Sequence, residues 1–123
     1  MKLCFLGAYD LDYPRNTVIK RGLRLNGVEV SECSVRPKYK FWLRYPLLFS
    51  RCFLSCLEYD FIFVPEFCQK DVPLAKILSL LASKKVIFDP LATRFETKIK
   101  DRKRKPLSSW QARWNFKIDC WAF

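Results

Sequence analysis

Four short apolar runs alternate with longer mixed segments along this chain of 123 residues, and this alternation limits the possible folds most strongly. Each run has the length and composition of a strand buried in a sheet. Strands that alternate with helices predict a parallel sheet with helices on both faces. We therefore expect an α/β, Rossmann-like fold with strand order 3-2-1-4. The runs are KLCFLG (2–7), VEVSEC (28–33), DFIFVP (60–65) and KVIFDP (85–90).

Helix signals occupy the segments between the runs. Asn16 is a suitable N-cap for a helix that ends near Asn26, before Gly27. The second helix lies in the second part of residues 36–59, and Pro46 predicts a break in it. We expect these helices to cover the predicted sheet.

Two further helices are expected in the second half of the chain. Asp71 can cap a helix over residues 72–83. The last helix starts at Ser108 or Ser109, and its large side chains recur on one face. These side chains are Trp110, Trp114, Ile118 and Trp121.

Length and composition indicate one folded domain over residues 1–123. A hydrophobic content of 50% excludes a disordered chain. No apolar run reaches the length of a membrane-spanning helix, and the start does not read as a secretory signal. The six cysteines form no C-x-x-C pair and the chain has no histidine, so we expect reduced thiols, a cytoplasmic location and no metal.

The net charge of +11 favours an anionic partner. Basic and aromatic residues interleave over 38–51, which suits a membrane interface or nucleic acid, although core packing explains the aromatic residues equally well. A second basic segment is either solvated or in contact with phosphates or anionic lipid, at about 1 kcal/mol per residue near a bilayer. Its basic residues are Lys98, Lys100, Arg102, Lys103, Arg104 and Lys105.

Polar side chains follow three of the predicted strands. In parallel sheets ligands bind beyond the carboxyl ends of the strands, so these side chains should meet at one rim. The chain lacks G-x-G-x-x-G and P-loop patterns, so we expect no dinucleotide and no other cofactor. The rim residues are Tyr9, Asp10, Arg15 and Asn16 after the first strand, Glu66 and Gln69 after the third, and Asp89 and Arg94 after the fourth.

A general base at this rim would have to be a carboxylate, because the chain has no histidine. The candidates are Asp10, Glu66 and Asp89, and we assign the catalytic role to Asp89. Simpler interpretations are open: Asp89 can merely end its strand, and Arg15 with Asn16 can be a solvated cation beside a helix cap.

Three segments resemble the N-terminal domain of GT-B glycosyltransferases, in the retaining group 1 family that uses nucleotide sugars. They are GAYDLDYPRN, VPEFCQKDVPLAK and KKVIFDPLATRFETKIKDRK, and the likeness covers nearly the whole chain. The family has two Rossmann-like domains that face a cleft. The resemblance implies that this chain binds the acceptor, a glycan or lipid-linked molecule, and that a second domain binds the donor without a metal.

The resemblance implies that the rim residues border the acceptor cleft. Many relatives have a histidine there, and this sequence has none. Without a donor domain, stabilisation of the leaving group would be missing, so we expect no sugar transfer by this incomplete part alone. The resemblance also implies peripheral contact with the inner face of a membrane.

An alternative function is a non-catalytic basic module that binds nucleic acid or an anionic membrane. The sequence contains no RNP, KH or zinc-finger pattern, so nucleic acid is the less favoured partner.

Overall fold

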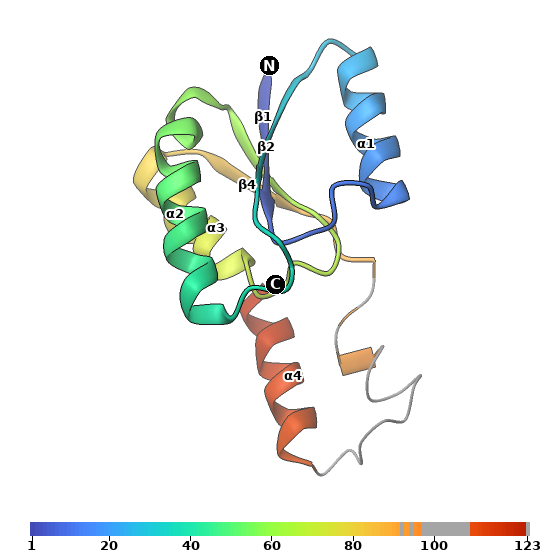
Figure 1. Cartoon of the computed structure of the whole chain (residues 1–123), viewed down its shortest axis with the longest axis vertical. Coiled ribbons are helices and arrows are strands. Elements are labelled where there is room, and N and C mark those ends of the chain that lie inside the picture. Colours follow the sequence, from blue (N-terminus) through green and yellow to red (C-terminus); the bar gives the residue numbers. More distant parts are fainter. Residues whose placement is uncertain (92, 94, 97–108, 123) are drawn as a thin grey trace.

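The computed structural model describes residues 1–91, 93, 95–96 and 109–122, except for the side chains of 41 and 54–57 (Figure 1). Strands and helices alternate as predicted. The elements are β1 (Lys2–Gly7), α1 (Pro14–Leu25), β2 (Glu29–Ser34), α2 (Phe41–Glu58), β3 (Phe61–Val64), α3 (Val72–Ala82), β4 (Lys85–Phe88) and α4 (Trp110–Ala122).

The four strands form one parallel sheet in the order β2-β1-β3-β4. The predicted order 3-2-1-4 is wrong, because β3 pairs with β1 and not with β2. The composition of the strands explains the difference. β2 carries the glutamates Glu29 and Glu32, which suit an edge, whereas Ile62 and Val64 of β3 are fully buried and suit the centre. β4 forms the other edge of the sheet, as predicted.

Helices cover both faces of the sheet: α1 lies on one face, and α2 and α3 lie on the other (Figure 1). The order reverses between β1 and β3, because the first crossover runs one way and the next two run the other way. The core is densest between the sheet and α2 and α3, where Leu6, Leu48 and Leu78 are almost completely buried. The reversal point places the loops after β1 and β3 side by side.

The N-terminal caps of two helices differ from the prediction. α1 begins at Pro14 with Tyr13 as its N-cap, because proline fixes a helical φ at the first position. Asn16 therefore lies inside the helix, and its predicted capping role is wrong. Asp71 does precede α3, but its side chain makes no capping hydrogen bond.

The predicted break at Pro46 is also wrong, since α2 is continuous through this residue. Pro46 lies in the second helical turn, where a missing N–H removes a single backbone bond. The buried side chains of Leu48 and Cys52, one helical turn apart, hold the helix on the core. Packing of this apolar stripe outweighs the local effect of the proline.

α4 has the predicted position, but only one of its four large side chains is buried. Ile118 is buried, whereas Trp110, Trp114 and Trp121 are 73%, 42% and 54% exposed. The buried side of α4 carries Asp119, whose Oδ2 accepts a hydrogen bond from the backbone N–H of Phe95 at 2.7 Å. This polar contact orients the helix with its tryptophans outward.

The cysteines described are thiols, buried at Cys4, Cys33, Cys52 and Cys68 and exposed at Cys120. Mostly buried thiols were predicted. Within the part of the chain that the structure describes, no helix is both long enough and apolar enough to cross a membrane.

Candidate functional site at the carboxyl edge of the sheet

Three elements meet at the carboxyl edge of the sheet through Arg15. Its guanidinium donates hydrogen bonds to Asp89, with Nε 3.1 Å from Oδ2 and Nη2 2.9 Å from Oδ1. The same Nε lies 3.3 Å from Oε2 of Glu66. Arg15 is in the first turn of α1, Glu66 follows β3 and Asp89 follows β4. The predicted convergence of these loops on one rim is therefore present for Arg15, Glu66 and Asp89.

Glu66 is an unusual carboxylate in this group. Its side chain is completely buried, and its ion pair with Arg15 lacks hydrogen-bond geometry because the Nε–H is directed at Asp89. Among the residues described, neither oxygen of Glu66 receives a hydrogen bond. Burial raises the pKa of Glu66 above its usual range, the nearby Arg15 lowers it, and the Asp89 carboxylate raises it further. Burial has the largest effect.

Asn16 is the second unusual polar group. It is 1% exposed, and within the described chain neither its Oδ1 nor its Nδ2 has a hydrogen-bond partner. Buried polar side chains almost always have partners, and an unsatisfied one destabilises a fold by about 1–3 kcal/mol. Asn16 therefore marks a place where a bound water or ligand would supply the missing hydrogen bonds.

A cavity of about 280 Å³ lies beside Asn16 and Glu66. It opens where the strand order reverses between β1 and β3, and doubly wound folds bind ligands at this point. Its volume is close to the lower limit of ordinary ligand pockets. Its lining consists of Ala8, Tyr9, Asp10, Tyr13, Asn16, Pro37, Arg44, Glu66 and Phe67.

Two aromatic rings form part of the cavity wall. Phe67 has φ = 63°, a left-handed conformation that is strained for a residue with a large side chain. Its ring is 51% exposed and meets the Tyr13 ring edge to face, with centroids 6.2 Å apart. The strained backbone thus presents an apolar surface at the cavity mouth.

Buried contacts hold the two main loops together. Oδ2 of Asp71 accepts a hydrogen bond from the Ala8 N–H at 2.9 Å and pairs with the Arg44 guanidinium. Gly7 allows the close approach, because its φ is +154° and an added Cβ would lie 2.9 Å from Sγ of Cys68. The cavity wall at Ala8 and Arg44 is therefore fixed by the core and not by a free loop.

A wider groove of about 940 Å³ continues from this cavity toward β2. Both cavities are lined by Tyr9, Asp10 and Pro37. The groove adds Arg36, Lys38 and Arg51, so its outer part is more basic than the inner cavity. Together they follow the carboxyl ends of β2, β1 and β3.

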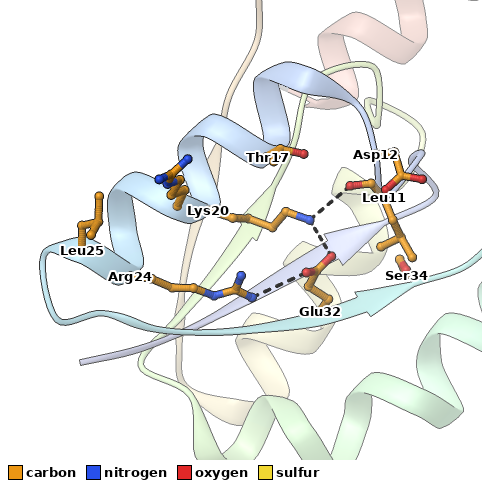
Figure 2. Close-up of a pocket in the computed structure, with 9 residues that line it drawn as sticks. Leu11, Asp12, Thr17, Lys20, Arg24, Leu25, Glu32 and Ser34 are labelled. Atoms are coloured by element: carbon orange, nitrogen blue, oxygen red, sulfur yellow. Dashed lines mark hydrogen bonds and ion pairs between the residues drawn. The ribbon is translucent and has the colours of Figure 1, made fainter.

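A third cavity, of about 820 Å³, lies between α1 and β2 and has a different character (Figure 2). Nζ of Lys20 donates to Oε2 of Glu32 at 2.8 Å and to the Leu11 carbonyl at 3.3 Å. Arg24 and the Tyr9 hydroxyl also approach Glu32, at 3.7 and 3.3 Å. The charged groups here satisfy one another, which indicates a structural cluster.

The structure brings some of the predicted site residues together and places others elsewhere. Arg15, Glu66 and Asp89 meet as described above, Asn16 and Glu66 line the same cavity, and Asp10 lies on the exposed rim. Tyr9 lines the cavity with its ring, but its hydroxyl turns toward Glu32. Gln69 is buried at 1% exposure, which places it in the protein interior. The catalytic assignment of Asp89 stays a prediction.

Some predicted site residues lie outside the described residues: Arg94 and the basic residues Lys98, Lys100, Arg102, Lys103, Arg104 and Lys105. Sequence reasoning also missed five cavity residues, which are Ala8, Tyr13, Pro37, Arg44 and Phe67. Tyr13 and Phe67 had a usable signal, because each adjoins or lies close to a predicted rim residue. Arg44 had none, since its place depends on how α2 returns across the sheet.

No protein-family model, curated protein or solved structure matches this chain. Within the described residues, no group of three or more cysteine, aspartate or glutamate side chains could hold a metal ion. A functional assignment therefore depends on the groups that line the carboxyl edge.

Proposed function

We propose that this chain is the acceptor-binding part of a GT-B glycosyltransferase, which moves a sugar from a nucleotide-sugar donor to a glycan or lipid-linked acceptor. The observation that supports this most is the pairing of Asn16 and Glu66. Both are buried beside one cavity, and neither side chain receives a hydrogen bond within the described chain. The sequence resemblance to the acceptor-side domain supplies the reaction class.

The chemistry of these groups suits a sugar ring. A hydroxyl group both donates and accepts hydrogen bonds, so one hydroxyl can donate to Glu66 while a neighbouring one accepts from the Asn16 amide. The apolar face of the ring can pack on Tyr13 and Phe67 at the cavity mouth. The basic groove toward Arg36 and Lys38 then accommodates an anionic part of the acceptor, such as a lipid-linked phosphate.

Two carboxylates are candidates to accept the proton of the attacking hydroxyl. Asp89 is the predicted catalytic group, and it is bound on two sides by Arg15. Glu66 has a raised pKa, which makes its carboxylate a better proton acceptor near neutral pH. When this chain is joined to a donor-binding domain, Asp89→Asn should lower turnover strongly if Asp89 is the base. If Glu66→Gln does so and Asp89→Asn does not, Glu66 has that role.

The binding proposal can be tested on the chain itself by NMR titration of the ¹⁵N-labelled protein with mono- and disaccharides. We expect weak, saturable shifts in the backbone amides of residues 8–13 and 66–67. Asn16→Leu should abolish the shifts, and Arg21→Ser, at an exposed position that lines the separate cavity between α1 and β2, should not. UDP- and GDP-sugars should give no stronger shifts than the free sugars, because the donor site lies on the other domain.

The proposal fails if no saccharide perturbs these amides. It also fails if the shifts concentrate on Lys20 and Arg21 in the groove between α1 and β2. Tight binding of oligonucleotides instead of saccharides would favour the non-catalytic alternative.

We also propose that the chain associates peripherally with an anionic membrane. The net charge of +11 supports this, because basic residues near an anionic surface each contribute about 1 kcal/mol. Sedimentation with vesicles that contain phosphatidylglycerol tests it, with pure phosphatidylcholine vesicles as the control. Equal binding to both, or to neither, would contradict the proposal.

A further inference from the structure

α4 carries an exposed aromatic ridge, formed by Trp110, Trp114 and Trp121. The rings of Trp110 and Trp114 stack with centroids 5.8 Å apart and planes 8° apart. Trp114 meets Trp121 edge to face at 5.9 Å. Each tryptophan can bury about 150–250 Å² of surface, so a ridge of three in contact with water is an unfavourable arrangement. Exposed apolar patches of this kind mark interaction surfaces.

The ridge faces away from the body of the protein. Ala112, Ile118 and Ala122 form the buried side of α4. With 3.6 residues per turn, Trp110, Lys117 and Trp121 lie close together on the opposite side. Figure 1 shows α4 extending from the sheet, with its carboxyl end nearest the body. The backbone carbonyl of Trp121 anchors this end by accepting a hydrogen bond from Lys76 at 3.0 Å.

The charges beside the ridge are all positive. Arg113 and Lys117 are exposed on α4. The one acidic residue of this helix, Asp119, is 5% exposed and is engaged by the Phe95 N–H. Tryptophan flanked by arginine and lysine is the composition of helices that lie in a bilayer interface, where the rings enter the headgroup region and the cations reach the phosphates.

We propose that the tryptophan ridge of α4 inserts into the interface of an anionic membrane. This inference rests on the peripheral association proposed above and adds the surface that makes the contact. A second copy of the chain is a poorer occupant, because two such faces would bring Arg113 and Lys117 against like charges. Nucleic acid is also poorer, because the stacking of Trp110 on Trp114 leaves only one face of each ring for a base.

Tryptophan fluorescence gives a direct test, because the chain has only four tryptophans. The fourth, Trp42, is 81% exposed on α2, and Trp42→Phe leaves α4 as the sole source of tryptophan emission. With phosphatidylglycerol vesicles we expect a blue shift, and quenching by lipids brominated on the acyl chain. Quenching in this variant tests the ridge without altering α4.

Two double variants measure how much the basic residues and the tryptophans of α4 each contribute to vesicle binding. Arg113→Ser with Lys117→Ser should weaken vesicle partition by roughly 25-fold, at about fivefold per basic residue. Trp110→Ser with Trp121→Ser should weaken it by more than about tenfold. The matched control, Arg21→Ser with Lys85→Ser, removes the same charge from exposed positions on α1 and β4 and should have a much smaller effect.

The outcomes separate this inference from the proposals on which it rests. Vesicle binding without a blue shift or quenching overturns the ridge and leaves peripheral association in place. Equal losses in the control and in the α4 charge variant also overturn it, because net charge alone would then be responsible. The absence of any vesicle binding overturns both the ridge and the peripheral association.

A dimer in sedimentation equilibrium that dissociates when Trp110 and Trp121 are replaced would assign the ridge to self-association. Saccharide binding is measured separately and does not depend on any of these results.

Discussion

Helix α1 contributes to two charged clusters that contain similar residues and behave differently. The closed cluster consists of Lys20, Glu32, Tyr9 and Arg24, between α1 and β2. The open cluster consists of Arg15, Asn16, Glu66 and Asp89, at the carboxyl edge. In the closed cluster every group has a nearby partner, with Lys20 bonded to both Glu32 and the Leu11 carbonyl. In the open cluster two buried groups, Asn16 and Glu66, receive no hydrogen bond within the described chain.

The difference shows that cavity size is a poor guide to function here. The closed cluster lines a cavity of about 820 Å³ and the open cluster adjoins one of about 280 Å³. A ligand gains most where it satisfies polar groups that the fold has already removed from water. The smaller cavity offers such groups, and the larger one offers charges that are already neutralised. We therefore expect the two clusters to respond in opposite ways to substitution.

The largest effect is expected in the closed cluster. Glu32→Ala leaves the nearly buried Lys20 without its carboxylate and should lower the free energy of unfolding by about 2–4 kcal/mol. Urea denaturation measures this loss. Adding Lys20→Met should restore part of it, because an apolar side chain replaces the unpaired charge. A loss below about 0.5 kcal/mol would mean that the cluster is not structural.

The open cluster should respond with the opposite sign. Asn16→Leu removes an unsatisfied amide and should raise the free energy of unfolding by about 1–2 kcal/mol in the absence of ligand. The same variant should lose saccharide binding. Asn16→Ala is the control for shape, because it removes the amide without adding volume. Destabilisation by both variants would show that Asn16 is a structural residue.

Titration of Glu66 should give a smaller effect. Its folded pKa lies above its unfolded pKa, so the folded state binds this proton more tightly. The stability that results is fully present below the unfolded pKa and is lost as pH rises through the folded pKa. Relative to Glu66→Gln, the wild type should therefore lose stability as pH rises above the ordinary glutamate range.

Carboxyl-carbon NMR can follow the same proton directly. Arg15→Gln should raise the pKa of Glu66 further, because the guanidinium lowers it. A pKa at or below that of an ordinary glutamate, in the wild type, would remove Glu66 as the proposed proton acceptor.

The smallest effect is expected at an exposed pair that belongs to neither cluster. Lys2 and Glu29 are 3.5 Å apart, and their side chains are 48% and 60% exposed. Glu29→Ala should change the free energy of unfolding by less than about 0.5 kcal/mol, because water screens such pairs. A loss of stability as large as that of Glu32→Ala would show that burial does not distinguish the Lys2–Glu29 pair from the Lys20–Glu32 pair.

Sequence reasoning found the elements better than their arrangement. Strands such as KLCFLG and KVIFDP are recognisable because an apolar run between turn residues has few alternatives. Pro46 misled the prediction, because packing of Leu48 and Cys52 is a tertiary effect that outweighs a local one. The spacing of the tryptophans on α4 likewise could not show that their rings lie outward, because Ala112, Ile118, Asp119 and Ala122 form the buried side of the helix.

The candidate site was partly visible in the sequence. Polar residues that follow parallel strands lie at the same edge of the sheet. This rule was enough to predict that Arg15, Glu66 and Asp89 lie close together. It could not show that Asn16 is buried with no hydrogen-bond partner among the described residues, or that Arg44 joins the cavity wall, because both depend on how α1 and α2 pack on the sheet.

The sequence by itself determined the alternation of strands and helices, the parallel sheet and the excess of positive charge, since these follow from local pattern and composition. The tertiary structure alone decided that β3 pairs with β1. It also decided which polar groups on α1 are satisfied and which are not. Both depend on contacts between residues far apart in the chain, where the competition between burial and hydrogen bonding is settled by packing.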